Sequence, residues 1–162
     1  MSTQPPSDTE ALARLRTHLD GMPPVAAMKI SIAGWDGRAL SLSAPLALHR
    51  NDKGSAYGGS LVSLMTATAW GLVTLRVEAA GLDADVFVAD SEVRYRAPLL
   101  ADLTAHARLD VEDAWPVFLA TLRARGRARA TVVTQIPLPG GAVATEARMR
   151  YAAILRTPAV PS

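Results

Sequence analysis

The spacing of apolar residues divides the chain into a helix, two short strands, one long apolar segment and several long strands. Leu12, Leu15 and Leu19 fall at helical spacing, which predicts an amphipathic first helix. We expect this helix to run from residue 9 to about 19 and to end at Gly21, before two prolines.

Two short segments of alternating polarity follow the first helix. Residues 27–33 carry Met28, Ile30 and Ile32 on one face, and residues 38–44 alternate in the same way. The Asp-Gly pair between the segments is typical of a tight turn. The pattern therefore predicts a hairpin with one dry face.

The segment from Leu61 to Leu75 contains no charged residue. A helix that is apolar on all sides is buried, and this run is short for a membrane span, so we expect a core helix and no membrane insertion. The polar loop 51–60 comes directly before it and carries the pair Gly58-Gly59. A loop of this length inside a compact domain is usually functional.

Long strands follow the apolar segment. Alternation places Ser91, Val93 and Tyr95 on one face of a strand, together with Phe87 and Ala89, and this face is expected to meet the helix. The segment 113–122 fits either a short helix or a strand. The strands predicted after the apolar segment are 86–97, 103–111, 125–136 and 143–155. One sheet packed on one helix is an α+β arrangement.

The composition of the chain mainly excludes certain kinds of structure and partner. The length of 162 residues fits one domain, expected at 9–156 between flexible termini at 1–8 and 157–162. There is no cysteine, so disulfides and thiolate chemistry are excluded. The net charge is only +2 and no nucleic-acid-binding motif accompanies the arginines, so we expect no nucleic-acid partner.

Two further expectations concern metals and location. The three histidines are scattered and lack matching carboxylates, so we expect no metal site. The N-terminal residues contain neither a basic nor an apolar signal region, which favours a cytoplasmic protein.

The start of the apolar helix is the strongest candidate site. The first N–H groups of a helix have no partner within it, and glycines leave them uncovered by side chains. Such a pocket suits a carboxylate, a phosphate or a carbonyl oxygen that gains negative charge. Gly58 N–H is our candidate for the donor. The alternative for Gly58-Gly59 is close packing of helix against sheet.

The loop sequence resembles a known motif. Asn51, Gly54, Tyr57, Gly58 and Gly59 keep the spacing that precedes the central helix of hotdog-fold acyl thioesterases, with Tyr57 where histidine is usual. The match is closest to the thioesterase domain found at the C-terminus of YiiD-like proteins. Supporting segments are 42–46, 69–72 and 89–95.

The resemblance implies a hotdog fold, in which an antiparallel sheet of about six strands wraps round one long helix. It also implies an acyl thioester substrate. Coenzyme A or the phosphopantetheine of an acyl carrier protein would enter as part of that substrate, with no separate cofactor. Hotdog domains pair through their sheets, so a homodimer or homotetramer is expected.

The resemblance also suggests roles for individual residues. Asn51 would orient water or the thioester, unless it only bonds its own loop. Tyr57 would donate a hydrogen bond, because a phenol is a poor base at neutral pH. Thr66 stands where related enzymes carry an acidic residue, and it can position water but not act alone as a base. Asp52 is the nearest carboxylate in the sequence, although a solvated loop acid is the simpler interpretation.

The remaining candidates are predicted to contact substrate. Gly59, Ser60 and Ser63 lie at or after the helix start, and Ser91 lies on the helix-facing side of a strand. His49 could reach the site, although a loop histidine is more often exposed. The arginines within 123–129 could hold coenzyme A phosphates or an acidic carrier protein, although a solvated strand face is the preferred explanation.

Three functions remain open from the sequence. The preferred one is hydrolysis of an acyl-CoA or acyl-carrier-protein thioester. The second is addition of an amine or water to an enoyl thioester in the same fold. The third is a non-catalytic domain that binds acyl thioesters.

Overall fold

The computed structural model describes residues 7–157. The helices are α1 (Asp8–Gly21), α2 (Pro23–Ala27), α3 (Gly58–Ala79) and α4 (Trp115–Arg125), with single 3₁₀ turns at Leu46–Leu48 and Glu112–Ala114. The strands are β1 (Ser31–Trp35), β2 (Leu40–Ala44), β3 (Ala84–Tyr95), β4 (Leu103–Leu109), β5 (Arg127–Pro137) and β6 (Val143–Leu155).

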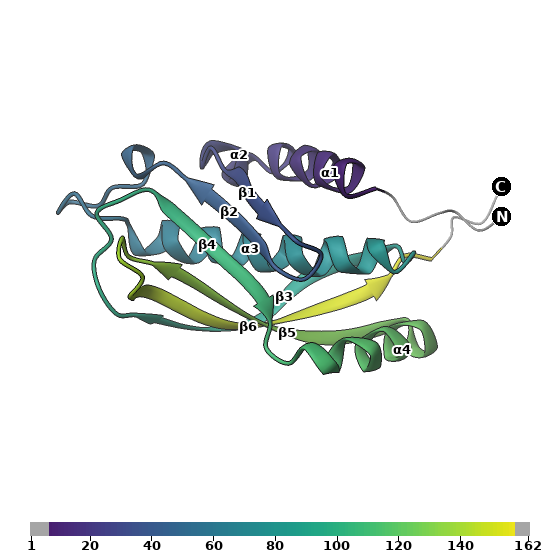
Figure 1. Cartoon of the computed structure of the whole chain (residues 1–162). Coiled ribbons are helices and arrows are strands. Elements are labelled where there is room, and N and C mark those ends of the chain that lie inside the picture. The colour runs from purple at the N-terminus through teal and green to yellow at the C-terminus, as the bar shows by residue number, and fades with distance from the viewer. Residues whose placement is uncertain (1–6, 158–162) are drawn as a thin grey trace.

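All strand pairs are antiparallel and form one six-stranded sheet in the order β1-β2-β4-β5-β6-β3. Figure 1 shows this sheet curling round α3, with α1 and α2 above that helix in this view and α4 beside β5. Trp115 and Arg123 of α4 contact the C-terminal part of α3. The predicted α+β arrangement, with a long helix inside a curved antiparallel sheet, is confirmed.

Helix α3 is the core of the domain. Leu64, Met65 and Leu72 are fully buried, and Gly71 lies so close to β2 that an added Cβ would come within 2.8 Å of the Leu40 side chain. By length and hydropathy α3 could cross a membrane, but 67% of the relevant window is buried inside the domain. The uncharged run was therefore correctly interpreted as a core helix.

The sheet follows the predicted alternation where its strands are paired on both sides. On β6, Thr145, Ala147, Met149, Tyr151 and Ala153 all face the core and are buried. Strand β4 buries its leucine and alanine positions and exposes His106 and Arg108. Strong alternation and pairing on both sides fix the register of such strands.

The predicted strand 27–33 is largely wrong. Residues up to Ala27 belong to the short helix α2, which begins with Pro23, and a turn with Lys29 at φ 54° separates it from β1. Proline suits the first turn of a helix, so it opens α2 as well as ending α1. Met28 and Ile30 are buried as expected, but they lie in the turn.

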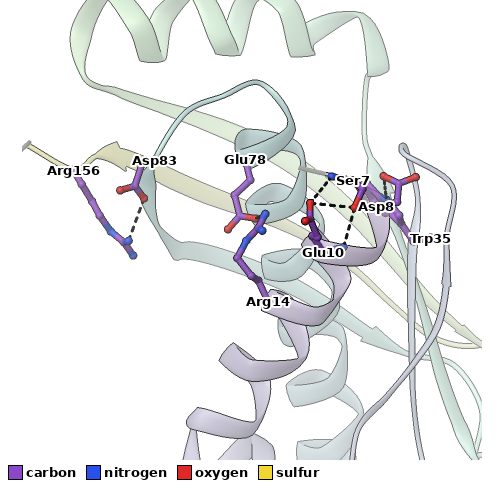
Figure 2. Close-up of polar contacts among 8 residues, drawn as sticks. All are labelled: Ser7, Asp8, Glu10, Arg14, Trp35, Glu78, Asp83 and Arg156. Atoms are coloured by element: carbon purple, nitrogen blue, oxygen red, sulfur yellow. Dashed lines mark hydrogen bonds and ion pairs between the residues drawn. The ribbon is translucent and has the colours of Figure 1, made fainter. Parts of the chain in front are cut away.

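Figure 2 shows the polar contacts that fix the start of α1 and the far end of α3. Ser7 is the N-cap of α1 and forms a capping box with Glu10. Trp35 Nε1 donates to the Asp8 carboxylate at 3.3 Å. Two ion pairs complete this end of the domain, Arg14 with Glu78 and Arg156 with Asp83.

The predicted flexible termini lie mostly outside the described residues. Residues 1–6 and 158–162 belong to that part of the chain. Within the described part, Ser7 and Asp8 form the start of α1.

Strand β3 departs from simple alternation. Its pairing with β6 shifts between Val88 and Asp90, where a bulge inserts one extra residue. Beyond the bulge Ser91 lies opposite the buried Met149, as predicted, but before it Val86, not Phe87, faces the core. The bulge therefore turns Phe87 outward, where 55% of its surface is exposed.

The ambiguous segment 113–122 is helical. Helix α4 starts at Trp115-Pro116 and ends at Gly126, whose φ of 71° is the left-handed conformation that terminates helices. Arg125 is the last residue of α4, so it does not share a strand face with Arg127 and Arg129.

Candidate active site

The loop before α3 is closed by the side chain of Asn51. Its Oδ1 accepts the N–H groups of Lys53 at 2.9 Å and Ser55 at 3.1 Å, and its Nδ2 donates to Ser55 Oγ at 2.9 Å. Gly54 takes φ 81° in the turn. The contacts of Asn51 are thus those of a loop-closing residue, and they set the direction in which the chain enters α3.

Helix α3 begins without a side-chain cap. Tyr57 is the N-cap residue and makes no side-chain cap bond, and the first helical bond runs from Leu61 N–H to the Tyr57 carbonyl at 3.1 Å. The N–H groups of Gly58, Gly59 and Ser60 precede that bond, so they are the free donors of the first turn. The helix dipole adds a partial positive charge at the same place.

Two tyrosines cover the glycine pair. The Tyr57 ring folds over Gly59, where an added Cβ would lie 2.4 Å from Tyr57 Cε1. Tyr95 from β3 lies against Gly58, with 3.4 Å between its Cε1 and an added Cβ, and its hydroxyl donates to the Gly58 carbonyl at 3.2 Å. An added methyl group at Gly59 would therefore require the exposed Tyr57 ring to move, whereas Gly58 tolerates a methyl group sterically.

A cavity of about 670 Å³ lies beside this helix start. It runs between the exposed side of α3, the short helix α2 and the end of β3 before its bulge. Its walls are mainly apolar, which is usual for small-molecule sites. The lining residues are Met22, Pro24, Val25, Met28, Tyr57, Gly59, Ser60, Val62, Ser63, Thr66, Ala67, Trp70, Val86, Phe87, Val88 and Tyr151.

Half of the sequence-predicted site residues meet in this cavity. Tyr57, Gly59, Ser60, Ser63 and Thr66 line it and form its polar end. The other five do not line it, namely Gly58, Asn51, Asp52, His49 and Ser91. Gly58 itself does not line the cavity, but its two neighbours in the chain, Tyr57 and Gly59, do.

Thr66 is held by backbone bonds. Its Oγ1 donates to the Val62 carbonyl at 2.8 Å, one turn back, and its own carbonyl accepts the Tyr151 hydroxyl at 2.8 Å. Burial raises the pKa of Tyr151 well above its ordinary value, so the phenol stays protonated and donates this bond. The pair forms the floor of the cavity.

His49 is buried, with 6% of its surface exposed, so the expectation of an exposed loop histidine was wrong. Its Nε2 lies 2.8 Å from the Met28 carbonyl oxygen and its Nδ1 lies 2.9 Å from Ser60 Oγ. His49 thus lies behind Ser60 and ties the loop to both α2 and α3.

No carboxylate from residues 7–157 lines the cavity. Asp52 is exposed and pairs with Lys53 at 2.8 Å, and Ser91 is exposed on the edge strand. Within residues 7–157, no group of three His, Asp or Glu side chains is placed to hold a metal ion. Arg123 bonds the Ala80 carbonyl beyond the C-terminal end of α3, roughly 30 Å along the helix from Gly58.

Sequence reasoning missed most of the apolar wall. Val25 lies in α2 and Met22 and Met28 flank it, whereas the sequence predicted only the end of a helix there and a strand from residue 27. Tyr151 comes from β6. Trp70 was noted only as part of the resemblance. The proline pair that opens α2 was the signal available, since proline is favoured at the first positions of a helix.

Comparison with known proteins supports the fold and identifies the family. The chain is similar to a structure from Chlorobaculum tepidum with unknown function, at 24% identity and a TM-score of 0.86 over 94% of this chain and 99% of that one. It is also similar to a Shewanella oneidensis protein called a putative thioesterase, at 28% identity and a TM-score of 0.80 over 90% and 99% of the two chains.

A Pseudomonas aeruginosa protein called a probable thioesterase shares the fold, at 24% identity and a TM-score of 0.78 over 95% and 100% of the two chains. Residues 12–154 match the family described as "Putative thioesterase (yiiD_Cterm)". That match covers nearly the whole described domain, from α1 to the end of β6. The chain therefore belongs to this family of hotdog-fold thioesterase domains.

Proposed function

We propose that the protein hydrolyses an acyl thioester whose carbonyl lies at the start of α3 and whose acyl chain fills the adjoining cavity. The observation that carries this proposal is the meeting of uncapped helix N–H groups with an apolar cavity of about 670 Å³. The family match and the name of the Shewanella relative support the same chemistry.

Thioester hydrolysis needs a donor for the oxygen that becomes negative in the transition state. Gly58 N–H is the proposed donor, because it is the first N–H of an uncapped helix and its neighbours Tyr57 and Gly59 both line the cavity. A preorganised backbone N–H at a helix start is suited to this role. Asn51 contributes by holding the loop that aims this N–H.

The chemistry of the substrate follows from the walls of the cavity. Val25, Met28 and Trp70 form an apolar wall that suits a hydrocarbon or aromatic acyl group. The thiol portion, from coenzyme A or an acyl carrier protein, would extend from the polar end into solvent. We propose a cytoplasmic site of action on such thioesters.

A panel of acyl-CoA esters tests the proposal through release of free thiol. We expect turnover with a clear preference for one range of chain lengths, and no release from esters too large for the cavity. An enoyl ester with an added amine is included, since formation of an adduct without thiol release would indicate addition chemistry instead. Binding of all esters without any turnover would contradict hydrolysis.

Filling the cavity should change chain-length preference. Ala67 lies on α3 and lines the cavity, so Ala67→Phe is expected to lower kcat/KM for the longest good substrate about 10-fold or more while short acyl esters retain activity. Ala79→Phe, at the exposed end of the same helix, serves as the matched control. Equal losses for short and long esters would contradict the placement of the acyl chain.

We also propose that two copies pair through β3. This strand has a partner, β6, on one side only, and it exposes Phe87, Val88 and Tyr95. A long edge with unpaired backbone groups and apolar side chains is a site for pairing with another strand. Phe87 and Val88 also line the cavity, so the second copy would lie close to the acyl chain.

Charge on this edge should separate the copies. Phe87→Lys is expected to shift the protein to monomer, measured by size-exclusion chromatography with light scattering, because the ammonium group would be buried in the interface. Val117→Lys is the control, since Val117 is 66% exposed on α4 away from β3. An unchanged mass for Phe87→Lys would exclude this edge as the interface.

A further inference from the structure

The proposed function leaves the proton acceptor unassigned, because no acidic side chain lines the cavity among the described residues. His49 can accept a proton, and it contacts the cavity wall through the hydroxyl of the lining residue Ser60. Ser60 is half-buried, lines the cavity and belongs to the uncapped first turn of α3.

The hydrogen bonds of His49 fix its tautomer. The Met28 carbonyl can only accept, so the Nε2 at 2.8 Å from it must carry the hydrogen. In the neutral ring, Nδ1 is then the acceptor, and the Ser60 hydroxyl at 2.9 Å donates to it. The serine oxygen is left with its lone pairs free for the cavity.

This is the arrangement of an activated nucleophile. A hydroxyl is bonded to a base, and the base is oriented by a third group, here a backbone carbonyl. We propose that Ser60 is a nucleophile for acyl transfer and that His49 is its general base. The proposal rests on the proposed thioester chemistry and goes beyond it, because it makes the reaction proceed through an acyl-serine.

The steps balance without any added reactant except water. Ser60 Oγ attacks the thioester carbonyl carbon while its proton passes to His49 Nδ1. The carbon–sulfur bond then breaks, and the leaving sulfur takes that proton. Water attacks the acyl-serine, its proton passes through His49 to Ser60 Oγ, and the free acid leaves. First-turn N–H groups of α3 stabilise the oxyanion in both halves.

A second serine–histidine pair in the same chain serves as a comparison for Ser60 and His49. Ser41 Oγ lies 2.7 Å from His106 Nδ1 on the outer face of the sheet, so it has the same pair of side chains. His106 is exposed, neither residue lines the cavity, and among the described residues no carbonyl holds the His106 Nε2. Ser41 should therefore be inert, whereas Ser60 should react.

The test uses a fluorophosphonate probe and thiol release in parallel on the full chain. We expect mass spectrometry to find the probe on Ser60 and not on Ser41. Ser60→Ala should lose labelling and lower kcat about 10³-fold or more, whereas Ser41→Ala should change neither. His49→Gln, which can keep an N–H toward Met28, should fold with a similar Tm and lower kcat about 10²-fold or more. His49→Asn is the second variant if the glutamine variant fails to fold.

The outcomes separate this proposal from the function on which it rests. Thiol release that persists in Ser60→Ala would overturn the nucleophile and leave hydrolysis standing. Absence of thiol release from every ester would overturn hydrolysis, while labelling of Ser60 that depends on His49 would still support the activated pair. Failure of Ser60 to label in active wild-type protein would overturn the pair.

Discussion

Gly58→Pro is expected to lower kcat for thioester hydrolysis by about 10²–10³-fold while the domain stays folded. Proline lacks the N–H that we propose as the oxyanion donor. The fold should accept it, because Gly58 is the first residue of α3 and proline is favoured at that position. Tyr57, which precedes it, already has the extended backbone, φ −65° and ψ 131°, that a following proline requires.

Gly58→Ala is the matched control for this variant. It places the same Cβ against the Tyr95 ring, at 3.4 Å, but keeps the N–H. We expect kcat within a few-fold of wild type for the alanine variant, measured by thiol release under the same conditions. Equal kcat in the proline and alanine variants would show that the Gly58 N–H takes no part in the reaction.

The second large effect concerns stability at the opposite end of α3. Arg76 has 9% of its surface exposed, its guanidinium binds Glu112 through two bonds of 2.9 and 2.5 Å, and it lies 4.6 Å from the centre of the Trp115 ring. Glu112→Ala would leave this charge buried without its partner. We expect a loss of about 2–4 kcal/mol in the free energy of unfolding, measured by urea denaturation.

The pH dependence of this pair has a defined sign. The bond from Arg76 holds the pKa of Glu112 below its ordinary value in the folded protein. The contribution of the ion pair to the free energy of unfolding is therefore fully present above the unfolded pKa of a glutamate. It is lost in acid, as the pH falls through the lower pKa of the folded state. The stability difference between wild type and Glu112→Ala should shrink below about pH 4.

Arg76→Met and the double variant complete a cycle that isolates the pair. If the double variant is as stable as Arg76→Met alone, the effect of Glu112 acts through Arg76. Because Arg76 lies roughly 27 Å along α3 from the proposed oxyanion donor at Gly58, kcat of Glu112→Ala should match wild type at a temperature where it is folded. A difference of less than about 0.5 kcal/mol between wild type and Glu112→Ala would contradict a stabilising role.

The sequence was sufficient for the elements whose pattern is strong and uninterrupted. The uncharged run from Leu61 to Leu75 predicted α3, and alternation predicted β6 with its buried face. The motif from Asn51 to Gly59 predicted the place of the candidate site. In each case the local sequence pattern agrees with the tertiary environment, so the pattern alone is enough to predict the element.

Other features depend on contacts that no local pattern encodes. The bulge after Val88 reverses the faces of β3 by one extra residue, and a period of two cannot reveal it. The burial of His49 depends on the Met28 carbonyl from α2 and on Ser60 from α3, so three separated segments create one pair of bonds. The sequence therefore predicts His49 only as a residue that could reach the site, and not its bond to Ser60.

The most direct measurement is a crystal structure with a non-hydrolysable acyl-CoA analogue, in which a methylene group replaces the thioester sulfur. Our account predicts the carbonyl oxygen within 2.7–3.1 Å of the first-turn N–H groups of α3. It also predicts the acyl chain along Val25, Met28 and Trp70, with Ser60 Oγ facing the carbonyl carbon. An acyl chain outside this cavity, or a carbonyl remote from Gly58 and Gly59, would contradict it.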